Sequence, residues 1–233
     1  MPKRNLDDLR RTPAYLFAEA AHYLNMPVTT LRAWCVGQNY YTHGEKHRFQ
    51  PVIALDGLPR EGLSFLNLVE AHVLAAIRRK HEVPLPKVRE AVSYVAKSLK
   101  VKRPLADVAF VTDGVNLFVR RLHQLLNVSQ GGQVASEELL RAHLQRVERD
   151  DAGIPIKLYP FTRTDVTLNA PAPVEMDPRI AFGRPVVRGR AVPTAVLAER
   201  FKGGDAIPFI AQDLEIDREA AADAIRCELE RAA

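Results

Sequence analysis

The segment AAHYLNMPVTTLRAWCVG, residues 20–37, constrains the fold of this chain more than any other stretch. Apolar residues recur at helical spacing up to Asn25, a suitable helix end, and Pro27 suits the first position of a second helix. In that second helix Val28, Leu31 and Cys35 are three and four residues apart, and they are predicted to form its buried stripe. The segment therefore predicts two short helices joined by a tight turn.

The residues after this pair of helices are typical of a small β-hairpin. Tyr40 and Tyr41 lead to a polar tip at residues 42–46, and the chain returns through residues 49–55. The order helix, turn, helix and hairpin is that of a winged helix-turn-helix. We expect this domain to span residues 13–103, because two longer helices follow the hairpin.

The two longer helices are predicted at residues 66–80 and 84–99. The second carries apolar residues at alternating intervals of three and four: Leu85, Val88, Val92, Val95 and Leu99. Such a seam is typical of a dimer contact between two helices. It is equally typical of a helix that faces the core of its own chain, and both interpretations stay open.

Residues 104–166 are predicted to form a small α+β middle segment. Apolar residues alternate on both sides of Asp113-Gly114, which favours a hairpin of residues 108–112 and 115–119. A second, shorter hairpin is predicted from residues 125–128 and 133–135, across Gln130-Gly131-Gly132. Ser136 is expected to cap a helix, and residues 156–159 are expected to form a further strand.

A linker rich in small residues and proline, TLNAPAPV (167–174), precedes a third domain at residues 175–233. Short extended pieces are expected first, followed by three helices at residues 194–202, 205–212 and 217–231. Asp205 and Asp217 are predicted N-caps. The predicted fold class is thus mostly α with small β-hairpins, ending in a three-helix domain that resembles a helix-turn-helix.

Charge is divided unequally along the chain. Residues 1–103 hold 17 Lys and Arg against 9 Asp and Glu, whereas residues 104–233 hold 16 against 19. A basic first half favours binding to a polyanion such as nucleic acid. The sequence has no apolar run of about 18 residues and no secretory signal, and Cys35 and Cys227 lie near opposite ends. We therefore expect a cytoplasmic protein without a membrane partner.

The residues give little support to enzymatic chemistry. There is no glycine-rich phosphate loop, no Gly-x-Ser-x-Gly and no His-Glu-x-x-His. The nearest approach to a metal-ligand set is Cys35, His43 and His47, with His22 close by, but solvated hairpin residues explain the last two histidines better. No catalytic residue, cofactor or metal site is predicted.

The predicted second helix and hairpin offer a better-supported role in DNA binding. Short polar and cationic side chains near the start of a recognition helix reach base edges and phosphates. The candidates are Thr29, Thr30, Arg32 and Ala33 on the helix, and Lys46, His47 and Arg48 on the hairpin. The alternative is a solvated basic hairpin. Trp34 is expected to pack between helix and hairpin rather than to touch a base.

Residues 14–100 resemble the MerR-type winged helix-turn-helix. The resemblance rests on YLFAEAAHYLNMPVTTLRAW, with Thr29, Arg32 and Trp34 at the Thr-x-x-Arg-x-Trp/Tyr positions of that family. The later helices of the family often form an antiparallel dimer contact. The last third, through DPRIAFGRPVVRG (177–189), is similar to domain-of-unknown-function family 433, common in bacterial antitoxins. It departs from that family at Arg190-Ala191-Val192, where Thr-Arg-Ile is usual.

Together the two resemblances imply a VapB-type antitoxin that is paired with a VapC-type PIN-domain ribonuclease toxin. An antitoxin would neutralise such a toxin either by placing an arginine at its acidic metal centre or by occluding its RNA groove. The candidates are Arg179, Arg184, Arg188 and Arg190. The alternative is that these arginines solvate a glycine-rich turn or hold two domains together. The tail helices expose acidic residues, which favours protein contact over DNA contact.

The sequence thus predicts a cytoplasmic homodimer within a toxin–antitoxin hetero-oligomer. It would neutralise its toxin and repress its own operon by binding operator double-stranded DNA. A MerR-type transcriptional regulator whose C-terminal half senses a small molecule is the second interpretation, and an adaptor that does not bind DNA is the third.

Overall fold

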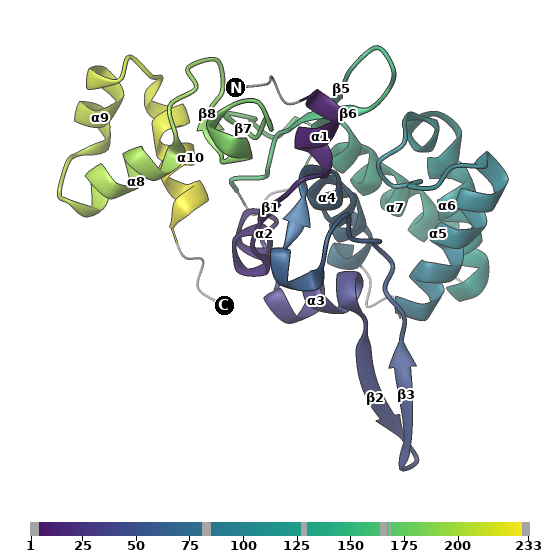
Figure 1. Ribbon diagram of the computed structural model, residues 1–233. Coiled ribbons are helices and arrows are strands. Elements are labelled where there is room, and N and C mark those ends of the chain that lie inside the picture. The colour runs from purple at the N-terminus through teal and green to yellow at the C-terminus, as the bar shows by residue number, and fades with distance from the viewer. Residues whose placement is uncertain (1–4, 81–84, 127–129, 164–166, 168, 230–233) are drawn as a thin grey trace.

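The computed structural model describes residues 5–80, 85–126, 130–163, 167 and 169–229. Within these residues the chain is mostly helical and has four small antiparallel two-stranded sheets, as predicted. Figure 1 shows a helical body, a long hairpin that projects away from it, and a small domain at the C-terminal end. No helix in the described part is long and apolar enough to cross a membrane.

The N-terminal elements form the predicted helix-turn-helix and hairpin. Their bounds are α1 Leu6–Arg11, β1 Pro13–Tyr15, α2 Phe17–Tyr23, α3 Val28–Val36, β2 Gln38–Thr42, β3 Glu45–Phe49, η1 Pro59–Glu61 and β4 Leu63–Ser64. Strand β1 pairs with β4 and carries Tyr15. In the hairpin of β2 and β3, called the wing below, His43 and Gly44 form the turn with φ of 53° and 83°. Two left-handed residues in a two-residue turn match the natural twist of a hairpin.

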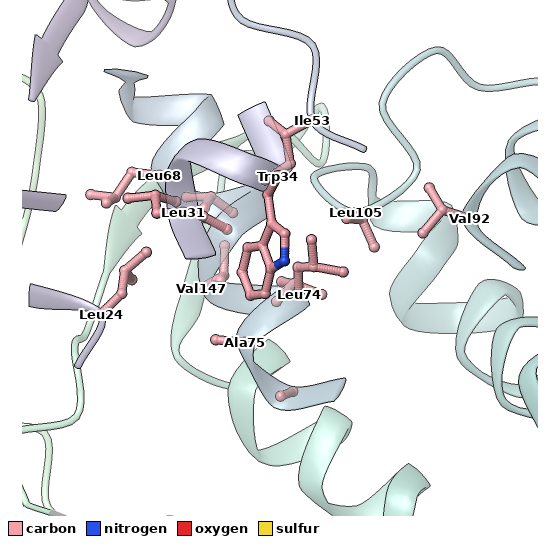
Figure 2. Close-up of a cluster of buried hydrophobic side chains, with 14 of the residues drawn as sticks. Leu24, Leu31, Trp34, Ile53, Leu68, Leu74, Ala75, Val92, Leu105 and Val147 are labelled. Carbon is pink, nitrogen blue, oxygen red and sulfur yellow. The ribbon is translucent and has the colours of Figure 1, made fainter. Parts of the chain in front are cut away.

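One hydrophobic core unites the N-terminal domain with the middle segment. The remaining helices and strands of this body are α4 Phe65–Lys80, α5 Leu85–Leu99, α6 Val115–Leu126, α7 Gln130–Leu144, β5 Val147–Arg149 and β6 Pro155–Leu158. The core extends from Tyr15 to Met176, and Figure 2 shows Trp34 of α3 beside Leu105 and Val147 of the middle segment. Residue 103 therefore does not separate two cores.

The predicted hairpin across Asp113-Gly114 is wrong. Residues 110–114 form the π-helical turn η2 (Phe110–Gly114), which leads directly into α6. A Cβ at Gly114 would lie 2.8 Å from the ring of Phe110, so this glycine allows close packing rather than a chain reversal. Four apolar side chains of α6 are buried at helical spacing: Val115, Phe118, Val119 and Leu122.

The second predicted hairpin is also wrong, because Leu125 lies in α6 and both Gln133 and Ala135 lie in α7; residues 127–129 lie outside the described part. Helix α7 packs against α4 and α6, and this packing outweighs the low helix propensity of the two glycines at 131 and 132. Ser136 consequently lies inside the helix instead of capping it. The strand predicted at residues 156–159 is confirmed as β6.

The apolar seam of α5 faces the core of its own chain. Val88 and Val95 are fully buried, Val92 is nearly so, and Leu85 and Leu99 pack partly buried against the same core. Helix α6 covers this face of α5. The core-facing interpretation is therefore the one that the structure supports, and the seam is not a free dimer surface.

The C-terminal domain, called the tail below, has a hydrophobic core of its own. It consists of β7 Val174–Glu175, η3 Ala181–Gly183, β8 Val186–Val187, α8 Thr194–Lys202, α9 Ile207–Asp213 and α10 Arg218–Glu228. Asp217 caps α10 as predicted, since its carboxylate accepts the N–H groups of Glu219 and Ala220. Asp205 is not a cap. Its carboxylate accepts a hydrogen bond from Arg200 at 2.8 Å, and Ala206 occupies the N-cap of α9.

A buried polar network fixes the chain between the wing and α4. The Asn67 amide donates to the carbonyl of Ala54 at 2.8 Å and accepts the N–H of Asp56 at 3.1 Å. Glu70 pairs with Arg103 at 3.0 Å, and Arg103 also pairs with Asp56 at 2.8 Å. These contacts hold the segment after the wing in one position, because each buried polar group has a partner.

Glu70 makes stability depend on pH. Burial raises the pKa of Glu70 from 4.5 to about 7, although the Arg103 guanidinium lowers it. The folded state thus favours the neutral carboxyl. The stability that the neutral Glu70 contributes is fully present below pH 4.5 and is lost as the pH rises from 4.5 through 7. We expect the melting temperature of the Glu70→Gln variant to fall less than that of the parent between pH 4.5 and 7.5. Equal changes in the two proteins would show that folding does not raise the pKa of Glu70.

Candidate nucleic-acid interface and C-terminal arginine segment

The buried face of α3 differs from the predicted one by part of a turn. Leu31, Trp34 and Cys35 are buried as expected, but Val28 is 38% exposed and Ala33 is buried. The large indole of Trp34 fills the space between α3 and α4. The rotation of α3 that places Trp34 there also turns the neighbouring Ala33 inward, and it leaves Val28, at the first position of the helix, facing solvent. Ala33 is therefore not a DNA contact, and Trp34 packs in the core beneath the helix rather than against the wing.

The outward face of α3 presents the other candidates. Thr29 and Arg32 are exposed, and Thr30 is half-buried near the helix N-terminus. The Arg32 guanidinium lies over the ring of Phe17 in α2, 4.9 Å from its centroid. A cation held on an aromatic face has less freedom than a solvated one, so the exposed Arg32 side chain is fixed in one position on the surface of the protein.

The wing divides its cationic residues between two faces. Residues opposite each other in an antiparallel pair share a face, and successive residues alternate. Lys46 pairs with Tyr41, and His47 pairs with Tyr40, on which it stacks at 5.4 Å. Lys46 and Arg48 therefore share one face of the wing, whereas His47 belongs to the other.

Two further contacts fix the base of the wing. Arg48 donates to the carbonyl of Val36, the last residue of α3, at 3.4 Å. Arg89 of α5 lies 6.0 Å from the centroid of the Phe49 ring, at the end of β3. Arg89 adds a cation beside the wing that sequence reasoning missed, since only the fold brings α5 to this position.

The four residues nearest to a metal-ligand set do not come together. Cys35 is buried, and burial raises the pKa of its thiol to about 12, so it is not a reactive thiolate. His43 and His47 lie on the exposed wing. His22 contacts the carbonyl oxygen of Cys227 with Nε2 at 2.8 Å. Among the described residues no group of three or more His, Cys, Asp or Glu side chains has the arrangement of a metal site.

The arginines proposed from the tail lie in one segment but have different local contacts. Arg179 pairs with the buried Asp177 at 2.6 Å, and Arg190 lies 3.5 Å from Glu215. Arg188 lies over the ring of Tyr159, 4.7 Å from its centroid. The side chains of Arg179 and Arg190 are about half exposed, so each can still offer part of its guanidinium to a partner.

Arg184 belongs to the junction between the tail and the helix-turn-helix. It pairs with Glu19 of α2 at 2.9 Å, and its guanidinium lies 5.8 Å from the Tyr15 ring centroid. The Tyr15 hydroxyl donates to the carbonyl of Gly183 at 2.9 Å. A cavity of about 230 Å³ adjoins this junction and is lined by Leu9, Thr12, Pro13, Ala14, Tyr15, Phe65, Pro178, Phe182 and Arg184. The tail therefore contacts β1 and α2 through Tyr15, Glu19 and His22, and Figure 1 shows it on this side of the body.

Comparisons with known proteins agree with this division of the chain. Residues 13–92 match a family described as "Putative DNA-binding HTH domain", and residues 174–226 match "Protein of unknown function (DUF433)". The curated protein "Putative antitoxin VapB45" of Mycobacterium tuberculosis H37Rv is 26% identical over 231 residues, which cover 91% of this chain and 92% of that protein.

A solved structure extends the likeness to the fold. The crystal structure of Rv2018 from Mycobacterium tuberculosis superposes with a TM-score of 0.69 and 24% sequence identity, over 92% of this chain and 97% of that one. The likeness covers the middle segment as well as the two matched domains. The chain joins a helix-turn-helix domain to a DUF433 domain and is similar over nearly its whole length to the protein named "Putative antitoxin VapB45".

Proposed function

We propose that this protein is the antitoxin of a toxin–antitoxin pair, and that it also represses its own operon. The observation that carries the proposal is the exposed cationic face of α3 and the wing on one domain, joined to a tail of the DUF433 type. The curated relative named as an antitoxin supports the same function. The partner would be a metal-dependent ribonuclease of the PIN-domain type.

The N-terminal domain would bind operator DNA in the MerR-like manner. Helix α3 would enter the major groove with Thr29 and Arg32, and the half-buried Thr30 would lie near a phosphate at the helix N-terminus. Lys46 and Arg48 would contact the adjacent backbone from one face of the wing. Two-fold symmetric operators are usual for helix-turn-helix proteins, so we expect two copies of the chain on each operator.

The two faces of the wing allow a matched test of DNA binding. We expect Lys46→Ala to weaken binding to the promoter fragment of its own operon and to lower the slope of log K against log salt by about one. His47→Ala alters the neighbouring residue on the opposite face and should leave both quantities unchanged at pH 8. Fluorescence anisotropy at several salt concentrations measures both variants. Equal losses would mean that both faces of the wing contribute to DNA binding and that Lys46 has no special contact.

The tail would bind the toxin. A PIN-type ribonuclease gathers carboxylates around divalent metal, and guanidinium groups pair well with such carboxylates. Co-expression with the product of the adjacent gene, followed by size-exclusion chromatography, tests this proposal. We expect both chains in one peak. Separate elution of two folded proteins would contradict it.

A second candidate function is supported by the junction cavity. A MerR-type regulator with a small-molecule sensor needs a pocket between its DNA-binding part and its C-terminal half, and the cavity of about 230 Å³ has that position. It is smaller than most ligand pockets, which favours the antitoxin. A neighbouring gene for a metabolic enzyme or an efflux pump, in place of a ribonuclease, would favour the sensor.

A further inference from the structure

We propose that Phe182 is the anchor residue by which the tail binds the toxin, with its ring entering an apolar pocket beside the carboxylates of the ribonuclease metal centre. This inference rests on the proposed antitoxin function and assigns the contact to one turn of the tail. It adds a residue that the predicted arginine set did not include.

The backbone around Phe182 is unusual. Ala181, Phe182 and Gly183 have φ of 47°, 56° and 81°, so three successive residues adopt left-handed conformations. Only glycine adopts this region readily, and a bulky residue with positive φ is an outlier that the surrounding structure must enforce. Strain of this kind concentrates at binding sites. The sequence therefore retains a phenylalanine where glycine would fit the backbone better.

The side chain of Phe182 gains little from this conformation within the chain. It is 91% exposed, more than any other large hydrophobic side chain described. A single exposed apolar side chain is common on protein surfaces, but one displayed by a strained backbone is not explained by folding. The combination indicates a side chain presented to a partner.

The turn that presents Phe182 is held from both sides. The buried Tyr15 hydroxyl donates to the Gly183 carbonyl at 2.9 Å, and the Gly183 N–H donates to the carbonyl of Ile180 at 2.8 Å. Asp177 accepts the N–H of Arg179 at 2.8 Å. A Cβ at Gly183 would lie 2.3 Å from the Tyr15 hydroxyl oxygen, so the close contact requires glycine. A turn fixed before binding loses little entropy when a partner docks.

The surroundings of Phe182 indicate the chemistry of that partner. Between residues 176 and 193 the charged side chains are Asp177 and four arginines, and Asp177 is only 1% exposed. The exposed charges of this segment are therefore all positive. Glu19 of α2 and Glu215 of the turn after α9 pair with two of the arginines but leave their guanidinium groups partly exposed. An apolar ring with cations on both sides fits an apolar pocket rimmed by carboxylates.

Phe209 of α9 provides a matched control. It is 57% exposed in the same domain, but it lies on a regular helix and has the Arg200 guanidinium 5.6 Å from its ring centroid. The effect of removing an exposed phenylalanine from the tail can thus be compared between Phe182, where the backbone is strained, and Phe209, where it is regular.

The test measures affinity of the full chain for the purified product of the adjacent gene by isothermal titration calorimetry. We expect Phe182→Ala and Phe182→Gly to weaken binding by about 30-fold or more, the loss typical of an interface anchor. Their melting temperatures should equal or exceed that of the parent, and their affinity for the promoter fragment should not change. Phe209→Ala should bind the toxin within about threefold of the parent.

The outcomes separate this inference from the proposed function. Parent-like toxin binding by both Phe182 variants would overturn the anchor and leave the antitoxin function standing. A lower melting temperature of both variants would overturn it too, because it would show that Phe182 serves folding. No binding by the parent protein would overturn the antitoxin function, and the anchor with it.

Discussion

Replacement of Trp34 by alanine is expected to lower the free energy of unfolding by about 4 kcal/mol, the usual cost of removing a fully buried aromatic side chain. Trp34 is completely buried, and Figure 2 shows it among Leu31, Leu74, Leu105 and Val147, from both the N-terminal domain and the middle segment. Its loss should therefore loosen the whole body rather than α3 alone. Urea unfolding followed by far-ultraviolet circular dichroism measures the effect.

Trp34→Phe is the matched control for this prediction. The indole N–H has no hydrogen-bond acceptor among the described residues, so a phenyl ring loses volume but no polar contact. We expect a much smaller loss of stability than for alanine. If Trp34→Ala lowered the free energy of unfolding by less than about 1 kcal/mol, Trp34 would not be the centre of a shared core.

Replacement of Arg32 by alanine is expected to weaken binding to the promoter fragment by roughly 10- to 100-fold, the loss that follows removal of one specific base contact. Arg32 is exposed on the outward face of α3 and is held over the Phe17 ring, so its removal should alter the interface without altering the core. Fluorescence anisotropy at fixed salt, with a scrambled fragment as reference, measures the loss.

The control for Arg32 is Arg218→Ala, which removes an equally cationic, exposed side chain from α10 in the tail. It should reduce DNA affinity only slightly, and the Arg32→Ala protein should still bind the toxin. Equal effects of the two variants on operator affinity would mean that net charge, not the α3 face, determines binding.

Local patterns predicted the elements whose packing is also local. Pro27, the Leu31/Cys35 spacing and the polar hairpin tip were sufficient to predict α3 and the wing, and the capping role of Asp217 was readable from its position. The inward position of Ala33 could not be predicted in this way, because the packing of the large Trp34 side chain against α4 sets the rotation of the helix.

The middle segment shows why pattern alone fails over longer distances. Residues 108–119 fit an alternating pattern and an Asp-Gly turn, but Val115, Phe118 and Leu122 also fit a helical stripe. Packing against α5 and the Phe110 ring decides between them, and the sequence does not display that packing. The buried pairing of Glu70 with Arg103, and the approach of Arg89 to the wing, likewise depend on tertiary contacts.

The tail arginines were recognised as a group, but their partners were not. Asp177 precedes Arg179 by two residues, whereas Glu19 of α2 and Glu215 of the turn after α9 are placed beside Arg184 and Arg190 only by the folded chain. The positive φ of Phe182 has no sequence signal except the glycine that follows it.

Growth rescue is the measurement that tests the antitoxin function most directly. The product of the adjacent gene is induced in a bacterial host, alone and together with the parent protein or its Arg32→Ala variant. We expect arrest by that product alone, and equal rescue by both forms, because neutralisation depends on the tail and not on DNA binding. Persistent arrest in the presence of folded, expressed parent protein would contradict the antitoxin function.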